Sequence, residues 1–384
     1  MKNLSIGVVL ALSLVGCSKK KPQENKEPPA PVDNTGSAGA MTGSAGSAAP
    51  AAEKTLVGKD LADKYVKCLG FINDGKADDF KSNCVADGYK GHMLDEAEIT
   101  ADQLTGEFAS MKKSFPDMKM SPQLILINNR DILAVELSQG TNSGPMALPG
   151  MPEMPATNKK VGTLFFHRLA INDANKATEE WGIEDPVTFM GQLGMLPKTA
   201  PPVRPATEKG WDGAPIIAVA DGGDKEKKNL DVVKKLMDDF NAKKNADLLA
   251  AMTDDAVESD QGDAKDHTGK KDIEAGLKMF QTAFPDAKVT ADNTWAAGDY
   301  VVVTGMFDGT NTGNMGPMKK TGKKVDAHFV EVYKLKDGKV SNVWRWMNGM
   351  AVMQQLGMMP PMPGAGSAAG SAAGSAAGSA APKK

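Results

Sequence analysis

The chain has 384 residues, a formal net charge of −3 and 24% charged residues. With no basic stripe outside the N-terminal segment, this nearly balanced charge argues against nucleic acid as a partner. The length is sufficient for two domains of ordinary size.

Residues 1–16 predict the signal peptide of a lipoprotein. Their apolar stretch, Leu4 to Val15, is shorter than the roughly 20 residues of a spanning helix and fits a secretory signal. It ends in LVGC (residues 14–17), which resembles the bacterial lipobox. We expect acylated Cys17 to anchor the protein in the cell envelope, and Ser18 after it favours the outer membrane, on either its periplasmic or its surface face. The alternative is an ordinary signal peptide with a chance cysteine.

Three segments of biased composition divide the rest of the chain. Residues 17–54 are rich in Lys, Pro, Gly, Ser and Ala, which predicts a disordered tether. Residues 362–384 repeat a Gly-Ser-Ala-Ala unit and predict a disordered tail, because glycine in every unit opposes a helix. Residues 198–228 begin in a proline-rich stretch and predict a linker. Two domains remain, at 55–197 and 229–361.

Cys68 and Cys84 are the cysteines that remain after the lipobox. An exported protein meets an oxidising environment, so we expect a structural disulfide between two early helices. Their spacing excludes a C-x-x-C redox motif.

The two domains are copies of one another. GTNSGPM at 140–146 recurs as GTNTGNMGPM at 309–318, SFPD at 114–117 as AFPD at 283–286, and GQLGMLP at 191–197 as QQLGMMP at 354–360. A helical stripe also recurs with its apolar character intact: Leu104, Phe108, Met111 and Phe115 match Ile273, Leu277, Phe280 and Phe284. The offset between the copies changes only in loops, which indicates a duplication.

Each copy predicts helices, a long amphipathic helix, strands joined by hairpins and a short terminal helix. Asp337-Gly338 is a strong hairpin signal in the second copy. The order predicts an α+β fold with two tandem domains and antiparallel sheets.

The second copy resembles the SnoaL-like (ester cyclase-like) family of the nuclear transport factor 2-like superfamily. The resemblance rests on the F-x-G-T-x-x-G run at 307–313, the TGKKV turn at 321–325 and the ending W-x-x-x-x-G…Q-L-G from Trp344. It spans about residues 230–360, and residues 58–197 resemble a diverged member. It implies cone-shaped domains, each a curved antiparallel sheet wrapped around helices with an apolar pocket. Some members are cyclases, isomerases or dehydratases, and many are binding domains.

In catalytic members an aspartate four positions after the late tryptophan acts as general acid/base. The second copy has Asn348 at that place, and an amide cannot exchange a proton near neutral pH. The first copy keeps Asp185. An alternative role is available, because Asp185 precedes Pro186 and both Asp185 and Asn348 suit the N-cap of a helix.

Strand alternation predicts which side chains share a face with these residues. Trp344, Trp346 and Asn348 share one face in the second copy, and Trp181, Ile183 and Asp185 share one in the first. We expect these two sets to line the pockets.

The histidines give weaker signals. His92 and His267 lie in what the repeat suggests are corresponding loops, where catalytic relatives often carry a histidine, and His267 is expected in the second pocket. His167 and His328 do not correspond to one another. The enzyme hypothesis therefore uses Asp185 with His92 or His167. No metal-ligand spacing is present, and we expect no metal or other cofactor.

Methionines cluster at 146–154, 315–318 and 347–362. Thioethers bind copper(I), but methionine also suits an adaptable apolar pocket and its rim, which the expected loop positions favour.

The leading functional hypothesis is an envelope lipoprotein that binds a small apolar molecule without catalysis. The alternatives are a cyclase or isomerase that uses Asp185, and a scaffold whose pockets are filled by its own side chains. The expected partners are the membrane, through Cys17, and the small molecule. A dimer or an envelope protein partner stays open.

Overall fold

The computed structural model describes residues 54–93, 98–146, 153–196, 200–316 and 318–358. The predicted signal peptide, Cys17, nearly all of the tether and the tail lie outside these residues. The elements, in chain order, are α1 (Gly58–Asn73), α2 (Ala77–Cys84), β1 (Val85–Met93), α3 (Ala101–Ser114), β2 (Lys119–Asn128), β3 (Asp131–Thr141), β4 (Lys160–Ile171), β5 (Ala177–Ile183), α4 (Pro186–Leu193), β6 (Ile216–Val219), α5 (Asp224–Asn241), α6 (Asn245–Ala250), β7 (Met252–Asp260), β8 (His267–Thr268), α7 (Lys270–Ala283), β9 (Lys288–Ala297), β10 (Tyr300–Thr310), β11 (Lys324–Lys336), β12 (Lys339–Met347) and α8 (Gly349–Gln355).

Two six-stranded sheets confirm the predicted α+β class and tandem organisation. Their strand orders are β1-β5-β4-β3-β2-β6 and β8-β7-β12-β11-β10-β9. The hairpin strands are antiparallel, but β1 runs parallel to β5 and β7 parallel to β12, so the sheets are mixed. In each copy a helix follows the strand that runs parallel: α3 comes after β1, and α7 comes after β7 and the short β8. The antiparallel hairpins that follow bring the last strand, β5 or β12, back beside β1 or β7.

The segment expected as a linker contains structure that belongs to the first sheet. β6 pairs in parallel with β2, from Leu124 opposite Ile216 to Ile127 opposite Val219. The predicted range also contains the start of α5. This connection therefore follows the edge of the first sheet before the chain enters the second domain.

The turn that the chain repeats has the same role in both copies. The buried side chain of Asn142 donates to the carbonyls of Ser114 (3.3 Å) and Gly144 (3.0 Å), and Asn311 makes the equivalent bonds in the second copy. A Cβ on Gly144 would lie 2.0 Å from the Lys113 carbonyl oxygen, so only glycine fits. The repeated asparagine and glycine thus fasten the loop to the end of the preceding helix.

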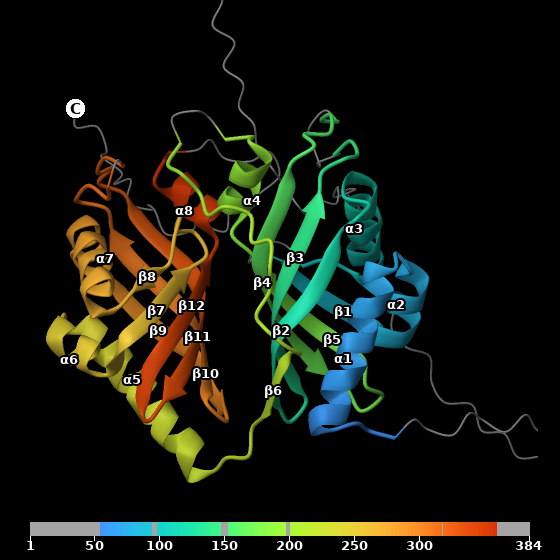
Figure 1. Cartoon of the computed structure of the whole chain (residues 1–384), viewed down its shortest axis with the longest axis horizontal. Helices are drawn as coiled ribbons and strands as arrows, with labels where there is room; N and C mark the ends of the chain where they lie inside the picture. Colours follow the sequence, from blue (N-terminus) through green and yellow to red (C-terminus); the bar gives the residue numbers. More distant parts are fainter. Residues whose placement is uncertain (1–53, 94–97, 147–152, 197–199, 317, 359–384) are drawn as a thin grey trace, which may run out of the picture.

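Helices cover the outer face of each sheet (Figure 1). α1, α2 and α3 lie over the first sheet, and α5, α6 and α7 over the second, each enclosing an apolar core. None of the described helices is long and apolar enough to cross a membrane.

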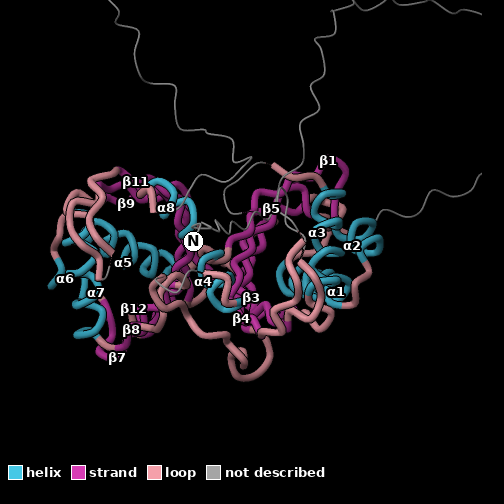
Figure 2. The backbone as a smooth tube through the Cα atoms, turned by 90° about the horizontal axis from the view of Figure 1, so that it is seen from above, coloured by secondary structure: helices cyan, strands magenta, loops and turns pink. Residues whose placement is uncertain are grey.

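The inner faces of the two sheets pack against each other between the domains (Figures 1 and 2). This interface is a third apolar cluster, and its buried members come from both sheets: Leu124, Leu126, Leu133, Val135, Phe166 and Ile183 from the first, and Trp295, Ala297, Tyr300, Val302, Val330, Val332 and Trp346 from the second. Strands β3 and β10 are therefore buried on both faces, which explains their nearly continuous apolar runs.

Candidate functional site

Five polar side chains converge inside the first cone, on the helix-covered face of its sheet. They are Tyr65 from α1, Tyr89 from β1, Glu136 from β3, His167 from β4 and Glu180 from β5, and all are buried. Successive side chains of a strand point to opposite faces of the sheet. On β4, Phe166 points into the interdomain cluster, and its neighbour His167 points into the first cone. We call this group the buried polar cluster.

His167 is the centre of the buried polar cluster. Its Nε2 lies 3.0 Å from Glu180 Oε1 and its Nδ1 lies 3.3 Å from Glu136 Oε2. Tyr65 donates its hydroxyl to Glu136, and Tyr89 donates to Glu180 Oε2 at 2.6 Å. One imidazole is thus held between two carboxylates, each of which accepts a tyrosine hydroxyl.

The electrostatics of the cluster favour a charged imidazolium. Burial opposes that charge, but the carboxylates of Glu136 and Glu180 outweigh it and raise the pKa of His167 to about 10. Burial likewise opposes ionisation of Glu180, yet the imidazolium of His167 and the hydroxyl of Tyr89 lower the pKa of this carboxyl below its ordinary value. His167 is therefore a fixed cation near neutral pH.

A cavity of about 40 Å³ adjoins the cluster. A water molecule needs about 10–15 Å³ of such space, so the cavity holds about three waters or a fragment of a few heavy atoms. Its wall is mostly apolar and includes a few polar side chains. The lining residues are Leu61, Lys64, Tyr65, Cys68, Leu69, Ile72, Phe80, Cys84, Phe108, Ile132, His167, Leu169, Ile171, Asn175, Ala177 and Glu180.

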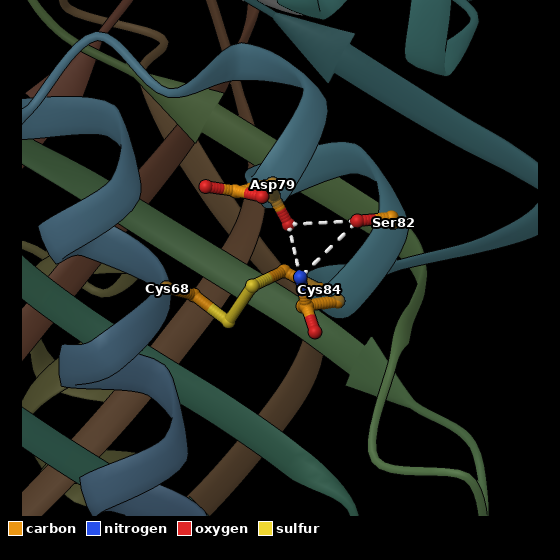
Figure 3. The surroundings of a disulfide bond; sticks show 5 residues. Cys68, Asp79, Ser82 and Cys84 are labelled. Carbon is orange, nitrogen blue, oxygen red and sulfur yellow. Dashed lines mark hydrogen bonds between the residues drawn. A yellow bond between two sulfur atoms is a disulfide. The ribbon is translucent and has the colours of Figure 1, made fainter.

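A disulfide forms part of the cavity wall. Cys68 on α1 and Cys84 at the end of α2 are joined, as the sequence predicts, with their Cα atoms 5.9 Å apart (Figure 3). Within α2, the Ser82 hydroxyl donates to the Asp79 carbonyl (Figure 3). The side-chain amide of Asn83 donates to the same carbonyl. The Cys68–Cys84 disulfide thus joins α1 and α2, which both contribute side chains to the cavity wall.

The second cone has a different polar group at the equivalent place. The guanidinium of Arg345 on β12 lies 2.6 Å from Glu331 and 2.5 Å from Glu258, and Tyr333 donates its hydroxyl to Glu331. Phe280, Phe284 and Phe307 pack together in the core beneath. The two cones therefore share a fold but differ in their inward chemistry.

The tryptophans expected in the pockets lie elsewhere, so that part of the predicted site is corrected. Trp346 is fully buried in the interdomain interface, where its indole N–H donates to the Leu164 carbonyl at 2.9 Å and its ring packs on Phe166. Ile183 lies in the same interface. Trp346 and Ile183 do lie on the strand faces predicted for them. Those faces are covered by the sheet of the other domain, so they do not line a pocket.

Trp344 and Trp181 also lie outside the cavity lining. Trp344 packs against Trp211 of the connecting segment, with ring centroids 4.8 Å apart. Trp181 stacks on His92 and lies under the Arg168 guanidinium. Both rings lie on the same strand face as Ile183 and Trp346, the face turned toward the other domain, and Trp344 packs at the edge of the interdomain cluster.

Asp185 and Asn348 are helix N-caps, which was the alternative prediction for both. Asp185 accepts from the backbone N–H of Thr188 at the start of α4, with Pro186 following, and Asn348 accepts from Ala351 at the start of α8. Burial raises the pKa of Asp185 to about 7. Its described contacts include neither His92 nor His167, so the structure does not assemble the expected catalytic pair.

The remaining histidines are dispersed. His92 lies on β1 and pairs with Glu179 at 2.9 Å, whereas His267 lies beside Asp263 and Asp272. His92 pairs with Trp181 on β5, and the residue that pairs with the matching Trp344 on β12 is Ser259. Ser259 is therefore the counterpart of His92, and the predicted correspondence of His92 with His267 is wrong. His328 is exposed.

Methionines gather where α4 and α8 meet. Met146, Met190 and Met350 are buried in one apolar cluster with Phe115 and Phe189. All its buried members except Met350 come from the first domain, so the cluster lies mainly in that domain and meets the second through α8. Among the described residues, no group of three or more His, Cys, Asp or Glu could hold a metal ion.

Comparison with known proteins identifies the class. The family model for SnoaL-like polyketide cyclases matches residues 59–193 and 231–356, which together make up more than half of the chain. The chain therefore belongs to the SnoaL-like family and carries two tandem copies of its domain. A search of curated proteins finds no significant match.

Several solved structures are similar to parts of this chain. A SnoaL-like polyketide cyclase from Jannaschia sp. CCS1 is 23% identical, with 37% of this chain and 99% of that chain covered and a TM-score of 0.35. IdmH, described as a polyketide cyclase from Streptomyces antibioticus, is 19% identical over 34% of this chain and 98% of its own, with a TM-score of 0.30. An NTF2-like protein from Burkholderia xenovorans LB400 is 18% identical over 35% and 99%, with a TM-score of 0.30. Each covers about one of the two domains.

The polar cluster was missed at the level of the sequence, apart from His167. The available signal was Glu136 in the middle of the apolar run ILAVEL at 132–137. A carboxylate inside a strand buried on both faces needs a buried partner, which directs attention to an inward-facing cation.

Proposed function

We propose that the protein is a membrane-anchored envelope lipoprotein whose first cone binds a small, largely apolar molecule without converting it. The observation that carries the proposal is the cavity in the first domain, with apolar side chains around most of its wall and His167 and Glu180 as part of the lining. An apolar wall with a few fixed polar groups is the usual composition of a small-molecule site. Anchoring through Cys17 rests on the lipobox-like sequence alone.

The charge state of the cluster supports binding over acid–base catalysis. A general base works best with a pKa near the working pH. The carboxylates of Glu136 and Glu180 raise the pKa of His167 to about 10, so at pH 7 its imidazole is protonated and cannot act as a general base.

The cyclase or isomerase alternative has less support. Its acid, Asp185, is committed to capping α4 and is absent from the cavity wall. Replacement of Asp185 by Asn keeps the cap and removes the acid, so turnover that survives this change would exclude the mechanism.

Native mass spectrometry tests the binding proposal. Residues Glu53–Met362, exported to an oxidising compartment and purified without detergent, should carry a small organic adduct that is lost in an Ala177→Leu variant, because Ala177 lines the cavity. A bare mass, reduced only by the two hydrogens of the disulfide, would contradict tight binding and favour the scaffold alternative.

Fractionation of cells tests the anchor separately. The full chain should sediment with membranes and incorporate labelled fatty acid, whereas a Cys17→Ala chain should do neither. Label that persists after this change would contradict acylation at Cys17.

A further inference from the structure

The donors of the buried polar cluster all face other members of the cluster. Tyr65 donates to Glu136 and Tyr89 donates to Glu180. Nε2 of His167 lies 3.0 Å from Glu180, and Nδ1 lies 3.3 Å from Glu136 and 3.5 Å from the Tyr65 hydroxyl. An imidazolium has two N–H donors and a tyrosine has one, so each donor already points at a group of the cluster.

Acceptor capacity does remain. Each carboxylate oxygen has two lone pairs, and one contact does not use both. Glu136 is fully buried, and its Oε2 accepts no hydrogen bond from the described residues, although it lies 3.3 Å from His167 Nδ1. Of the two carboxylates, Glu180 is the one that lines the cavity, so a ligand there gains most as a hydrogen-bond donor to Glu180.

The net charge of the buried polar cluster also favours a ligand that donates hydrogen bonds. Two acidic side chains face the one imidazolium, which gives the cluster a net negative charge, and burial raises the pKa of both tyrosines so that they stay neutral. The groups are removed from water, so this charge acts over the cavity with little screening. A carboxylate ligand would be repelled and a cationic one attracted.

The other polar lining residues do not reverse this preference. The side chain of Asn175 accepts from the Leu56 N–H at 2.8 Å and donates to the Lys54 carbonyl at 3.0 Å, so it is already engaged. Lys64 is half-buried, and its flexible stem lets the ammonium reach water.

We propose that the cavity of the first cone selects a small molecule with an apolar body and a protonated amine, in preference to the matching alcohol or carboxylate. The proposal rests on the function proposed above and names its ligand class. The apolar body contacts the wall formed by Leu61, Leu69, Phe80 and Leu169, and the ammonium donates to Glu180. The cavity volume restricts the part of the ligand held beside Glu180 to a few heavy atoms.

Three probes with the same three-carbon skeleton test this preference: propylammonium, 1-propanol and propionate. Each is titrated at pH 7 into the full chain held in nanodiscs of zwitterionic lipid, with saturation-transfer NMR as the readout and empty nanodiscs subtracted. We expect propylammonium to bind at least tenfold more tightly than 1-propanol, and propionate to bind most weakly. If propylammonium no longer binds to the Ala177→Leu variant, its binding site is the cavity that Ala177 lines.

Two matched variants locate the preference. Glu180→Gln should reduce the advantage of propylammonium over 1-propanol to less than threefold. Glu179→Gln, one residue along β5, should leave it unchanged, because Glu179 is 38% exposed and pairs with His92. If Glu180→Gln does not fold, the order of the three probes on the unaltered chain still decides.

The outcomes separate the two proposals. Binding of 1-propanol or propionate as tight as that of propylammonium would overturn the amine preference while leaving small-molecule binding intact. Propionate binding that disappears in Lys64→Gln would overturn it by placing recognition at the rim. Failure of all three probes to bind would overturn both.

Discussion

Replacement of Trp346 by alanine should weaken the junction between the two domains. The side chain is fully buried, its ring centroid lies 5.8 Å from that of Phe166, and its N–H donates to the Leu164 carbonyl across the interface. Truncation of a buried tryptophan costs about 3–5 kcal/mol, which is a large part of the roughly 5–15 kcal/mol that stabilises an ordinary domain. The first domain should lose stability although the altered residue belongs to the second.

Hydrogen exchange followed by mass spectrometry measures this effect strand by strand. Trp346→Ala should raise exchange in β4, which includes Leu164, as well as in β11 and β12. Trp346→Phe should keep much of the packing but lose the hydrogen bond, at a cost of about 1–3 kcal/mol for the unsatisfied buried carbonyl. Phe307→Ala is the matched control, because Phe307 lies in the core of the second domain away from the interface. The reasoning would be refuted if β4 exchanged no faster in Trp346→Ala than in Phe307→Ala.

Three further predictions concern the disulfide, the helix cap and the histidine. Reduction, or a Cys68→Ser/Cys84→Ser double variant, should cost about 3 kcal/mol, because the bond closes a loop of 16 residues; urea unfolding should show the loss in the first domain, and an unchanged midpoint would contradict it. Asp185→Asn should stabilise the protein increasingly from pH 4 to pH 8: the folded pKa of about 7 exceeds the unfolded value, so the stabilising contribution of Asp185 is present at acid pH and is lost as pH rises through 7. The expected gain at pH 8 is on the order of a few kcal/mol, and a difference that does not vary with pH would count against it. The imidazole of His167 should remain doubly protonated at pH 8 by nitrogen NMR, because its pKa is raised to about 10; its contribution to stability is present below the unfolded pKa and disappears only as pH rises through 10, and a neutral ring at pH 8 would exclude the fixed ion pair.

The fold could be predicted from the sequence because the duplication repeats its local signals. The GTN turns, the matching helical stripes and the Asp337-Gly338 hairpin each specify local structure, and both copies agree on them. The parallel edge strands were not predicted, since pairing between β1 and β5 depends on where the chain returns after the hairpins.

The site could be predicted only in part, because alternation identifies the residues of one face but not the environment of that face. Trp346 and Ile183 were placed on the correct shared face of their strands, yet that face packs on the other domain. The apolar run of β3 and the YVVV run of β10 indicate strands buried on both faces, and they could have warned of a second packing surface.

The role of His167 is hidden from the repeat for a related reason. The second copy has Glu331 at the place of His167, yet both residues turn inward and take part in buried ion pairs. In this chain the two copies bury a polar side chain at the same place, but the side chain itself differs. The partners that make His167 meaningful come from α1, β1, β3 and β5, far apart in the sequence.

A crystal structure of the exported protein, purified without added ligand, would test the binding proposal most directly. We predict density for a small organic molecule in the first cone, in contact with Glu180 and the apolar wall beside the Cys68–Cys84 disulfide. Ordered water alone in that cavity, or a cavity closed by its own side chains, would contradict the proposal that the first cone is a binding site.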